Sequence, residues 1–235
     1  MAFFPHACSG EGVSLHNNTE SCPSAPCNNQ DVSGAYNLRK VAEADFPTRW
    51  GHFRIMGFEG PPQSGTERRL ETAVALVMGD IHSEPPLVRI HSQCLTGDVF
   101  GSLRCDCQQQ LEMSLKMIAE TGRGVLVYEQ QEGRGIGLMA KLEAYELQDK
   151  GLDTVEANEK LGFKADQREF ALPAEVLKAL GLRQVRLLSN NPDKVQALEK
   201  AGVKVVERVP CVAEAQSHSE AYLRTKQQKM GHIFG

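Results

Sequence analysis

Short apolar runs in the first half of the chain predict strands. Residues 52–58, 73–78 and 87–91 have strand length and apolar character, and turns rich in Gly and Pro separate them. A further run at residues 124–128, with the sequence GVLVY, has the continuous apolar character of a buried strand. We therefore expect the N-terminal part of the chain to be rich in β-structure.

Apolar positions spaced by three or four residues predict helices further along. One helix is expected over residues 109–120, and a second amphipathic helix over residues 137–150, where Gly151 would end it. The pattern then alternates between helices and strands, over residues 174–180, 184–188, 192–200, 203–207 and 219–230. Such alternation predicts the fold class α/β: a mixed-sheet, layered α/β fold behind a β-rich N-terminal part.

The first 35 residues differ from the rest of the chain. Residues 1–35 are rich in Ser, Asn, Pro, Gly and Cys and show no periodicity, so they cannot bury enough apolar surface to fold alone. We interpret residues 1–35 as a disordered or non-native N-terminal extension and residues 36–235 as the folded domain. The alternative is a second metal site made by Cys22 and Cys27 with Cys8 or His16.

Composition excludes several classes of protein. A net charge of −4 gives no general signal for polyanion binding, so we expect no nucleic acid as a partner. No apolar run approaches the roughly 20 residues of a membrane span, and we expect no membrane partner. Seven cysteines, an odd number, with no signal-peptide pattern favour a cytoplasmic protein whose thiols stay reduced.

Three of the cysteines form a tight cluster that predicts a metal site. Cys94 follows a predicted strand, and Cys105 and Cys107 precede a predicted helix, where both sulfurs can converge on one ion. Structural zinc usually has four protein ligands and catalytic zinc three, with water as the fourth. His91 or Asp106 would complete a structural site, so spacing alone leaves the structural and catalytic interpretations open.

Two turns between a strand and a helix are candidate anion sites. The turn at residues 132–137, EGRGIG, contains Arg134, whose guanidinium suits phosphate, although many such turns are only tight turns. The second turn, at residues 189–194, places Asn191 as a helix cap before Pro192 and brings Lys194 to the helix start. A phosphate contact and plain helix capping with a solvated lysine are both open there.

Longer segments occur in one order along the chain. They are RIHSQCLTGDVFGSLRCDC at residues 89–107, EGRGIGL at 132–138, DTVEAN at 153–158, LGFKADQREF at 161–170, NNPDK at 190–194 and KMGH at 229–232. Together these segments resemble the motifs of the GTP cyclohydrolase II family, over roughly residues 38–233. Several long motifs in the right order are far more specific than any one of them.

The resemblance implies an activity and a set of partners. It implies a fold like that of GTP cyclohydrolase II, with residues 36–235 as the catalytic domain, and a zinc-dependent hydrolase that opens the imidazole ring of GTP. The products would be 2,5-diamino-6-ribosylamino-4(3H)-pyrimidinone 5′-phosphate, formate and pyrophosphate, in the first committed step of riboflavin biosynthesis. It also implies one Zn²⁺ per subunit, Mg²⁺ with the GTP phosphates, and a homodimer. The alternatives are another zinc-dependent purine nucleotide hydrolase, and a nucleotide sensor that binds GTP without turnover.

The same resemblance assigns roles to residues of this sequence. The zinc ligands would be Cys94, Cys105 and Cys107, with water as the fourth, which favours the catalytic interpretation. Asp166 would be a proton acceptor, and Arg168 either a nucleophile or a group that stabilises transferring charge. Arginine is protonated at ordinary pH, which makes it a poor nucleophile.

Two further sets of residues carry over from the family. Tyr145 would act in ring opening, although by helical pattern alone it shares a stripe with Leu138 and Leu142 and would be a core residue. Glu132 would accept hydrogen bonds from guanine and so discriminate GTP from ATP. The substrate contacts implied are Arg89, Ile90, His91, Ser92, Gln93, Gln110, Glu132, Gly133, Arg134, Thr154, Ser189 and Lys194. Gln93 and Ser189 depart from the commonest family residues, Glu and Thr, but keep their capacity for hydrogen bonding.

Overall fold

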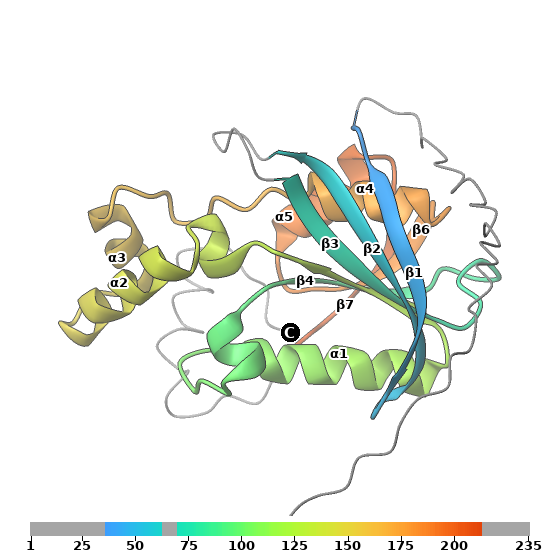
Figure 1. Ribbon diagram of the computed structural model, residues 1–235, viewed down its shortest axis with the longest axis horizontal. Helices are drawn as coiled ribbons and strands as arrows, with labels where there is room; N and C mark the ends of the chain where they lie inside the picture. The colour runs from blue at the N-terminus through green and yellow to red at the C-terminus, as the bar shows by residue number, and fades with distance from the viewer. Residues whose placement is uncertain (1–35, 63–69, 213–235) are drawn as a thin grey trace, which may run out of the picture.

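One mixed sheet forms the centre of the molecule (Figure 1). The computed structural model describes residues 36–62 and 70–212, and within these ranges seven strands are hydrogen-bonded in the order β1-β2-β3-β5-β4-β6-β7. The strands are β1 (Arg39–Thr48), β2 (Gly51–Pro62), β3 (Leu70–Met78), β4 (Leu87–Ser92), β5 (Gly124–Glu129), β6 (Gln184–Leu188) and β7 (Lys204–Val209). The predicted mixed-sheet α/β class is confirmed.

The sheet has an antiparallel half and a parallel half. Strands β1, β2, β3 and β5 pair antiparallel in turn, whereas β5-β4, β4-β6 and β6-β7 are parallel pairs. The chain therefore begins with a meander and continues as an α/β layer, which confirms the predicted β-rich N-terminal part. Parallel neighbours need crossover connections, and the helices supply them.

Strand β1 was not predicted from the sequence. Its ten residues, RKVAEADFPT, lack an apolar alternation, and most of them are exposed. It pairs with β2 at the edge of the sheet, where charged side chains hinder pairing with other chains. Tertiary pairing, rather than an apolar pattern, makes this segment a strand.

Helices cover both faces of the sheet. In Figure 1, helix α1 (Cys107–Thr121) lies below the sheet, and α4 (Ala171–Ala179) and α5 (Pro192–Lys200) lie above it. Strand β4 alternates between the two layers: Leu87 packs in the cluster that includes Ile118 of α1, whereas Val88 and Ile90 pack in the cluster that includes residues of α4. This two-sided burial explains the continuous apolar strands of the sequence.

Two helices extend beyond the edge of this layered core. Helix α2 (Leu138–Asp149) and the short α3 (Thr154–Lys160) lie together at the left of Figure 1. Helix α3 was not predicted, although Asp153 and Glu156 form the capping box that marks its start. Helix α2 was predicted, and Gly137 precedes it as its N-cap.

The inner face of α2 is not the apolar stripe that the pattern favoured. Of the three stripe residues, Leu142 is 44% exposed and Leu138 and Tyr145 are only partly buried, whereas the buried residues of α2 are Lys141 and Ala144. The core interpretation of this stripe is therefore wrong. The physical reason is that α2 packs mainly against α3 and against the turn at Glu132–Gly135 instead of against the sheet.

Some predicted features lie outside the described residues. They include the N-terminal extension at residues 1–35 with its alternative metal site, and the helix expected over residues 219–230. Within the part that the structure describes, no helix combines the length and apolar character that crossing a membrane requires.

Candidate active site

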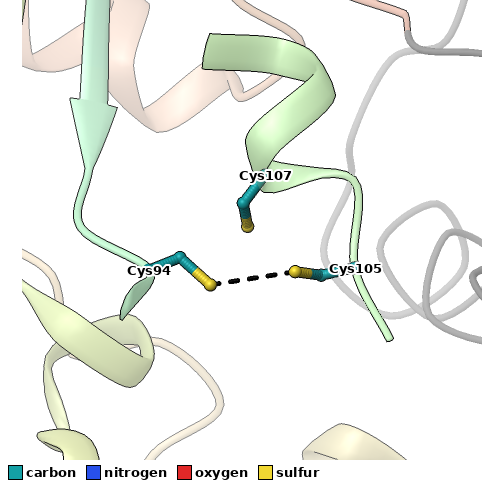
Figure 2. A group of neighbouring side chains, drawn as sticks. All are labelled: Cys94, Cys105 and Cys107. Atoms are coloured by element: carbon teal, nitrogen blue, oxygen red, sulfur yellow. Dashed lines mark hydrogen bonds between the residues drawn. The ribbon is translucent and has the colours of Figure 1, made fainter. Parts of the chain in front are cut away.

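Three sulfur atoms meet where strand β4 ends and helix α1 begins. Cys94 follows β4, Cys105 lies in the approach to α1, and Cys107 is the first residue of that helix. The three Sγ atoms lie within 4.8 Å of one another, and those of Cys94 and Cys105 are 3.7 Å apart. Figure 2 shows the three side chains turned toward a common point. The predicted convergence is confirmed.

Gly97 is the residue whose backbone lies against the three cysteines, and it therefore bears on whether a metal ion fits there. This residue lies in a turn, η1 (Leu95–Val99), that passes beside the sulfurs. A Cβ atom at Gly97 would lie 2.9 Å from the Sγ of Cys105 and 3.2 Å from that of Cys94. At Gly97 the turn thus brings bare backbone, and no side chain, against the cluster. Three soft thiol donors suit zinc.

Neither His91 nor Asp106 joins the sulfurs as a fourth ligand. Among the described residues, the ligand atoms gathered at this point come from the three cysteines alone. The Nε2 atom of His91 lies 3.1 Å from Oδ1 of Asp98, and the Asp106 carboxylate accepts a 2.6 Å hydrogen bond from Gln110. Both alternatives for a closed structural site are therefore engaged elsewhere.

Asp98 fixes the backbone at the first cysteine. Its Oδ2 atom accepts hydrogen bonds from the N–H of Cys94 at 3.0 Å and from the hydroxyl of Tyr128 at 2.8 Å. The ring of His91 stacks on Tyr128, with the centroids 5.5 Å apart. Burial lowers the pKa of His91, so its imidazole is neutral at pH 7.

The thiols differ in acidity. Hydrogen bonds from Cys105 and Cys107, together with the charge of Lys141, lower the pKa of Cys94 far below its usual range. The other two thiols and burial raise the pKa of Cys107, although this residue lies at a helix start.

A buried ion pair adjoins the cluster. Glu132 begins a 3₁₀ turn, η2 (Glu132–Gly135), and its Oε1 accepts hydrogen bonds from the ammonium of Lys141 at 2.7 Å and from the N–H of Gly133 at 3.0 Å. Its Oε2 accepts a 2.6 Å hydrogen bond from the N–H of Leu95. Gly133 and Arg134 both have left-handed backbone, with φ of 62° and 61°, which folds this turn tightly.

Tyr145 lies on the inner side of α2. Its hydroxyl is 3.2 Å from Oγ1 of Thr96, and the guanidinium of Arg104 lies 4.7 Å from its ring centroid. Burial raises the pKa of Tyr145, so the phenol keeps its proton at neutral pH.

Asp166 and Arg168 form a two-pronged ion pair. The Nε and Nη2 atoms of Arg168 donate to the two carboxylate oxygens of Asp166 at 2.9 and 2.5 Å. Burial opposes ionisation of Asp166, but the hydrogen bonds and charge of Arg168 outweigh it, and the pKa of Asp166 is lowered. Nη1 of Arg168 also donates to Oγ of Ser92 at 3.4 Å.

Backbone contacts hold the loop that carries this ion pair. The side chain of Gln131 accepts from the N–H of Glu169 at 2.9 Å and donates to its carbonyl at 2.5 Å. The N–H of Gln167 donates to the carbonyl of Arg134 at 3.0 Å. The loop of residues 166–169 is thus fastened to the turn of residues 131–135.

These groups border one open cleft. It encloses about 660 Å³, part of which is open to solvent. The lining residues include the three cysteines, Lys141, Tyr145 and Arg168. A thiol cluster, a phenol and a guanidinium therefore face a common space.

Comparison with known proteins assigns the family. A sequence profile of the GTP cyclohydrolase II family matches residues 39–210. The chain belongs to the GTP cyclohydrolase II family. It is 54% identical over 197 residues to GTP cyclohydrolase-2 of Escherichia coli (strain K12 / DH10B), which covers 83% of this chain and 97% of that protein. It is 52% identical over 197 residues to GTP cyclohydrolase-2 of Buchnera aphidicola, which covers 83% and 98%.

One solved structure shows a partial likeness. It is a two-domain 3,4-dihydroxy-2-butanone 4-phosphate synthase from A. baumannii, 18% identical, with a TM-score of 0.41 over 75% of this chain and 40% of that one. This likeness adds nothing to the family assignment, which rests on sequence and confirms the resemblance seen in the motifs.

In this member of the GTP cyclohydrolase II family, the predicted site residues fall into two groups. The first group lines the cleft together with the cysteines, Tyr145 and Arg168, and consists of Ser92, Gln93, Glu132, Gly133, Arg134 and Thr154. Asp166 joins this group through its ion pair with Arg168. The structure thus brings together segments that lie far apart in the sequence.

The second group is buried outside the cleft lining. It consists of Arg89, Ile90, His91, Gln110, Ser189 and Lys194. Arg89 donates to Gln110 at 2.7 Å and to the carbonyl of Leu188 at 3.1 Å, and Lys194 donates to the carbonyl of Ile90 at 2.9 Å. Substrate contacts by these residues stay predictions.

Lys141, Asp98 and Gln131 have structural partners in this GTP cyclohydrolase II site that sequence reasoning did not find. Asp98 lies inside the quoted segment of residues 89–107, so the motif contained it without indicating a role. Lys141 lies in an otherwise ordinary amphipathic pattern, and only the face that α2 buries reveals it. No spacing rule would have found Gln131, because its partner is the backbone of Glu169.

Proposed function

We propose that this protein is a zinc-dependent hydrolase that opens the imidazole ring of GTP. The products would be 2,5-diamino-6-ribosylamino-4(3H)-pyrimidinone 5′-phosphate, formate and pyrophosphate, which makes this the first committed step of riboflavin biosynthesis. The observation that carries the proposal is the common cleft, in a chain of this family, that joins three converging thiols to Tyr145 and Arg168.

Cys94, Cys105 and Cys107 would hold one Zn²⁺ per subunit. The metal would supply a hydroxide nucleophile near neutral pH for attack on C8 of guanine. The donor set supports zinc, since the three thiols, with no fourth ligand among the described residues, would leave one coordination position open. Gly97 places no side chain against the cluster.

Glu132 would recognise the guanine base. An ionised carboxylate offers about four lone-pair sites, and three of them are used by Lys141, Leu95 and Gly133. The remaining site can accept one N–H of guanine, a donor that adenine does not present in the same place. The fixed orientation of Glu132 would make this acceptor selective for GTP.

Cations at the end of the sheet would bind the triphosphate, together with Mg²⁺. Arg134 and Thr154 line the cleft, with the other predicted contacts Ser92 and Gln93. Lys194 is buried outside the cleft lining, and burial together with the neighbouring charges of Arg168 and Arg89 lowers its pKa. A phosphate nearby would relieve this repulsion, which supports the predicted roles of Arg89, Lys194 and their neighbours.

Arg168 would stabilise charge while pyrophosphate leaves the α-phosphorus. Its ion pair keeps Asp166 ionised and keeps the guanidinium protonated. A protonated guanidinium is suited to transferring charge rather than to nucleophilic attack. Asp166 would then orient Arg168, instead of taking its proton.

Tyr145 would assist ring opening as a hydrogen-bond donor. The phenol keeps its proton because burial raises its pKa, and its hydroxyl lies beside Thr96 in the loop that follows Cys94. A neutral hydroxyl there can donate to a nitrogen or oxygen of the opening ring.

Exposed apolar side chains and free thiols support a proposed oligomeric state and a proposed cellular location. Val99, Phe100, Leu103, Met139 and Leu142 are exposed apolar side chains near the cleft-lining residues in sequence, which supports a homodimer. The four described cysteines, Cys94, Cys105, Cys107 and Cys211, are free thiols, which supports a cytoplasmic location, where thiols stay reduced. Residues 36–235 would form the catalytic domain.

Formate release tests the proposal directly. The zinc-loaded full chain is incubated with GTP, and formate, pyrophosphate and the pyrimidine product are assayed separately, with Cys105→Ser as the control. We expect all three products from the native chain, and a loss in the variant larger than the roughly hundredfold effect of changes outside the ligand set. Pyrophosphate without formate would indicate a different nucleotide hydrolase, and GTP binding without turnover a sensor.

A further inference from the structure

The ammonium of Lys141 stands where the thiol cluster meets the base-recognising carboxylate. It donates to Oε1 of Glu132 at 2.7 Å, to Oγ1 of Thr96 at 2.9 Å and to Sγ of Cys94 at 3.2 Å. These three acceptor atoms can use all three N–H donors of the ammonium. The Lys141 side chain is only 11% exposed.

A buried lysine needs a compensating role in the fold. Lysine is almost never fully buried unless it is paired, because desolvation of an ammonium is costly. Helix α2 nevertheless turns Lys141 inward while it leaves Met139 and Leu142 exposed. The pattern is the reverse of a core helix, and it places a fixed positive charge beside Cys94.

The ion pair of Lys141 and Glu132 holds three consecutive residues of the metal-ligand loop. Lys141 contacts the sulfur of Cys94 and the hydroxyl of Thr96. Glu132 accepts from the N–H of the residue between them, Leu95. The loop is therefore fixed on the side of η2 and α2 by these two side chains acting as a unit.

The charges of the thiolates, Glu132 and Lys141 also link the metal site to the Glu132 carboxylate. Three thiolates around a divalent ion carry one excess negative charge, and Glu132 adds another beside it. Lys141 is the cation that contacts both groups. A hydrogen bond to a thiolate also draws electron density from the sulfur, which makes the bound metal a stronger Lewis acid.

We propose that Lys141 is a positioning residue that connects the metal site to base recognition, fixing Cys94 and the ligand loop on one side and the Glu132 carboxylate on the other. The proposal rests on the function proposed above for the same cleft. It predicts that one substitution in α2 alters both metal binding and the use of GTP, although α2 contains no cysteine of the cluster.

The test compares Lys141→Met, Lys141→Arg, Glu132→Gln and the double variant Lys141→Met/Glu132→Gln in the full chain. Lys150→Met is the control, because it makes the same change at the exposed end of α2. Metal affinity is measured by competition with a chelator, and Co²⁺ replaces zinc as a spectroscopic probe. The KM and kcat for GTP are measured on the zinc-loaded proteins.

Lys141→Met should weaken metal binding about tenfold or more and move the thiolate-to-cobalt charge-transfer band to lower energy, since the sulfur becomes richer in electrons. The KM for GTP should rise as Glu132 loses its orientation. Lys141→Arg should restore much of the affinity and of the band position, and Lys150→Met should match the native chain.

The double variant guards against a folding defect. It removes both charges, so neither is left buried without its partner, and its loss of metal affinity should be smaller than the sum of the single losses. An unchanged cobalt spectrum and unchanged metal affinity in Lys141→Met would overturn the proposal. If Lys141→Met does not fold, the same two results in the double variant would overturn it.

Failure of the proposed function gives a different result. A native chain that releases no formate, but whose cobalt spectrum shifts in Lys141→Met, would refute GTP ring opening and leave the connection through Lys141 in place. The metal measurements need no turnover, so the two outcomes are distinguishable.

Discussion

The two halves of the sheet have different tasks. In the antiparallel half, β1, β2 and β3 supply core residues and a charged edge, and none of their described residues was predicted to act in the site. In the parallel half, the candidate groups follow the carboxyl ends of strands: Cys94 after β4, Glu132 after β5 and Ser189 after β6. The comparison shows that the candidate site residues gather at the carboxyl ends of the parallel strands, as ligand sites do in other α/β sheets.

Among the changes that test this contrast, the largest effect should come from Arg168, which contacts Ser92 at the carboxyl end of β4. Arg168→Lys keeps a positive charge but loses the two-pronged pairing with Asp166. We expect pyrophosphate release to fall about a hundredfold or more, as when one charge-stabilising donor is removed, while zinc content is unchanged. Rapid-quench assays with labelled GTP would measure it, and undiminished release would refute charge stabilisation by the guanidinium.

A smaller effect is expected at Tyr145. Tyr145→Phe removes one hydroxyl and keeps the ring beside Arg104. Formation of the ring-opened product should slow about tenfold, the value of one hydrogen bond near 1.4 kcal/mol. Zinc content, measured by atomic absorption, serves as the control, and equal turnover would assign Tyr145 to packing alone.

Stability should depend on pH through Asp166. Its pKa is lowered in the folded chain, so its ion pair stabilises the fold above the ordinary Asp value, and this stabilisation is lost as pH falls through the folded value. Asp166→Asn should therefore lower the free energy of unfolding at pH 7, and the difference from the native chain should shrink below about pH 5. Urea unfolding at several pH values measures this, and a constant difference would contradict it.

The smallest effect is expected in the antiparallel half. Lys40 in β1 pairs with Glu43 at the surface, and such pairs contribute at most about 1 kcal/mol. Lys40→Gln should leave the kcat for GTP within about twofold and the unfolding free energy within about 1 kcal/mol. A large loss of activity would break the contrast between the halves, because it would place the edge strand in contact with the catalytic machinery.

The sequence predicted which segments form helices and strands better than it predicted which side of each is buried. Strands β4 and β5 were expected from short apolar runs, because they are buried between both layers of the core, and α1 was expected from the spacing of its apolar positions. Helix α5 was expected from its cap at Asn191 and Pro192. Strand β1 was missed because an exposed edge imposes none. Helix α3 is so short that its capping box was the main signal.

The candidate site was also predicted only in part, because the sequence does not show which face of a helix or strand is buried. The three cysteines could be expected to converge from their place between a strand and a helix start, and they do. Lys141 could not be found, since its importance depends on which face of α2 turns inward. The sequence also could not predict that Arg89 and Lys194 are buried away from the cleft lining, because their burial depends on the packing of β4 against two layers.

Gly97 has a consequence for how the site can be manipulated. Its backbone lies outside the left-handed region, so alanine is compatible with the turn, but the added methyl group would clash with Sγ of Cys105 and press tightly on Sγ of Cys94. Gly97→Ala would therefore push the thiols apart while every thiol, cleft side chain and charge of the native chain remained. One methyl group would thus separate the effect of the spacing of the three sulfurs from the effect of their number.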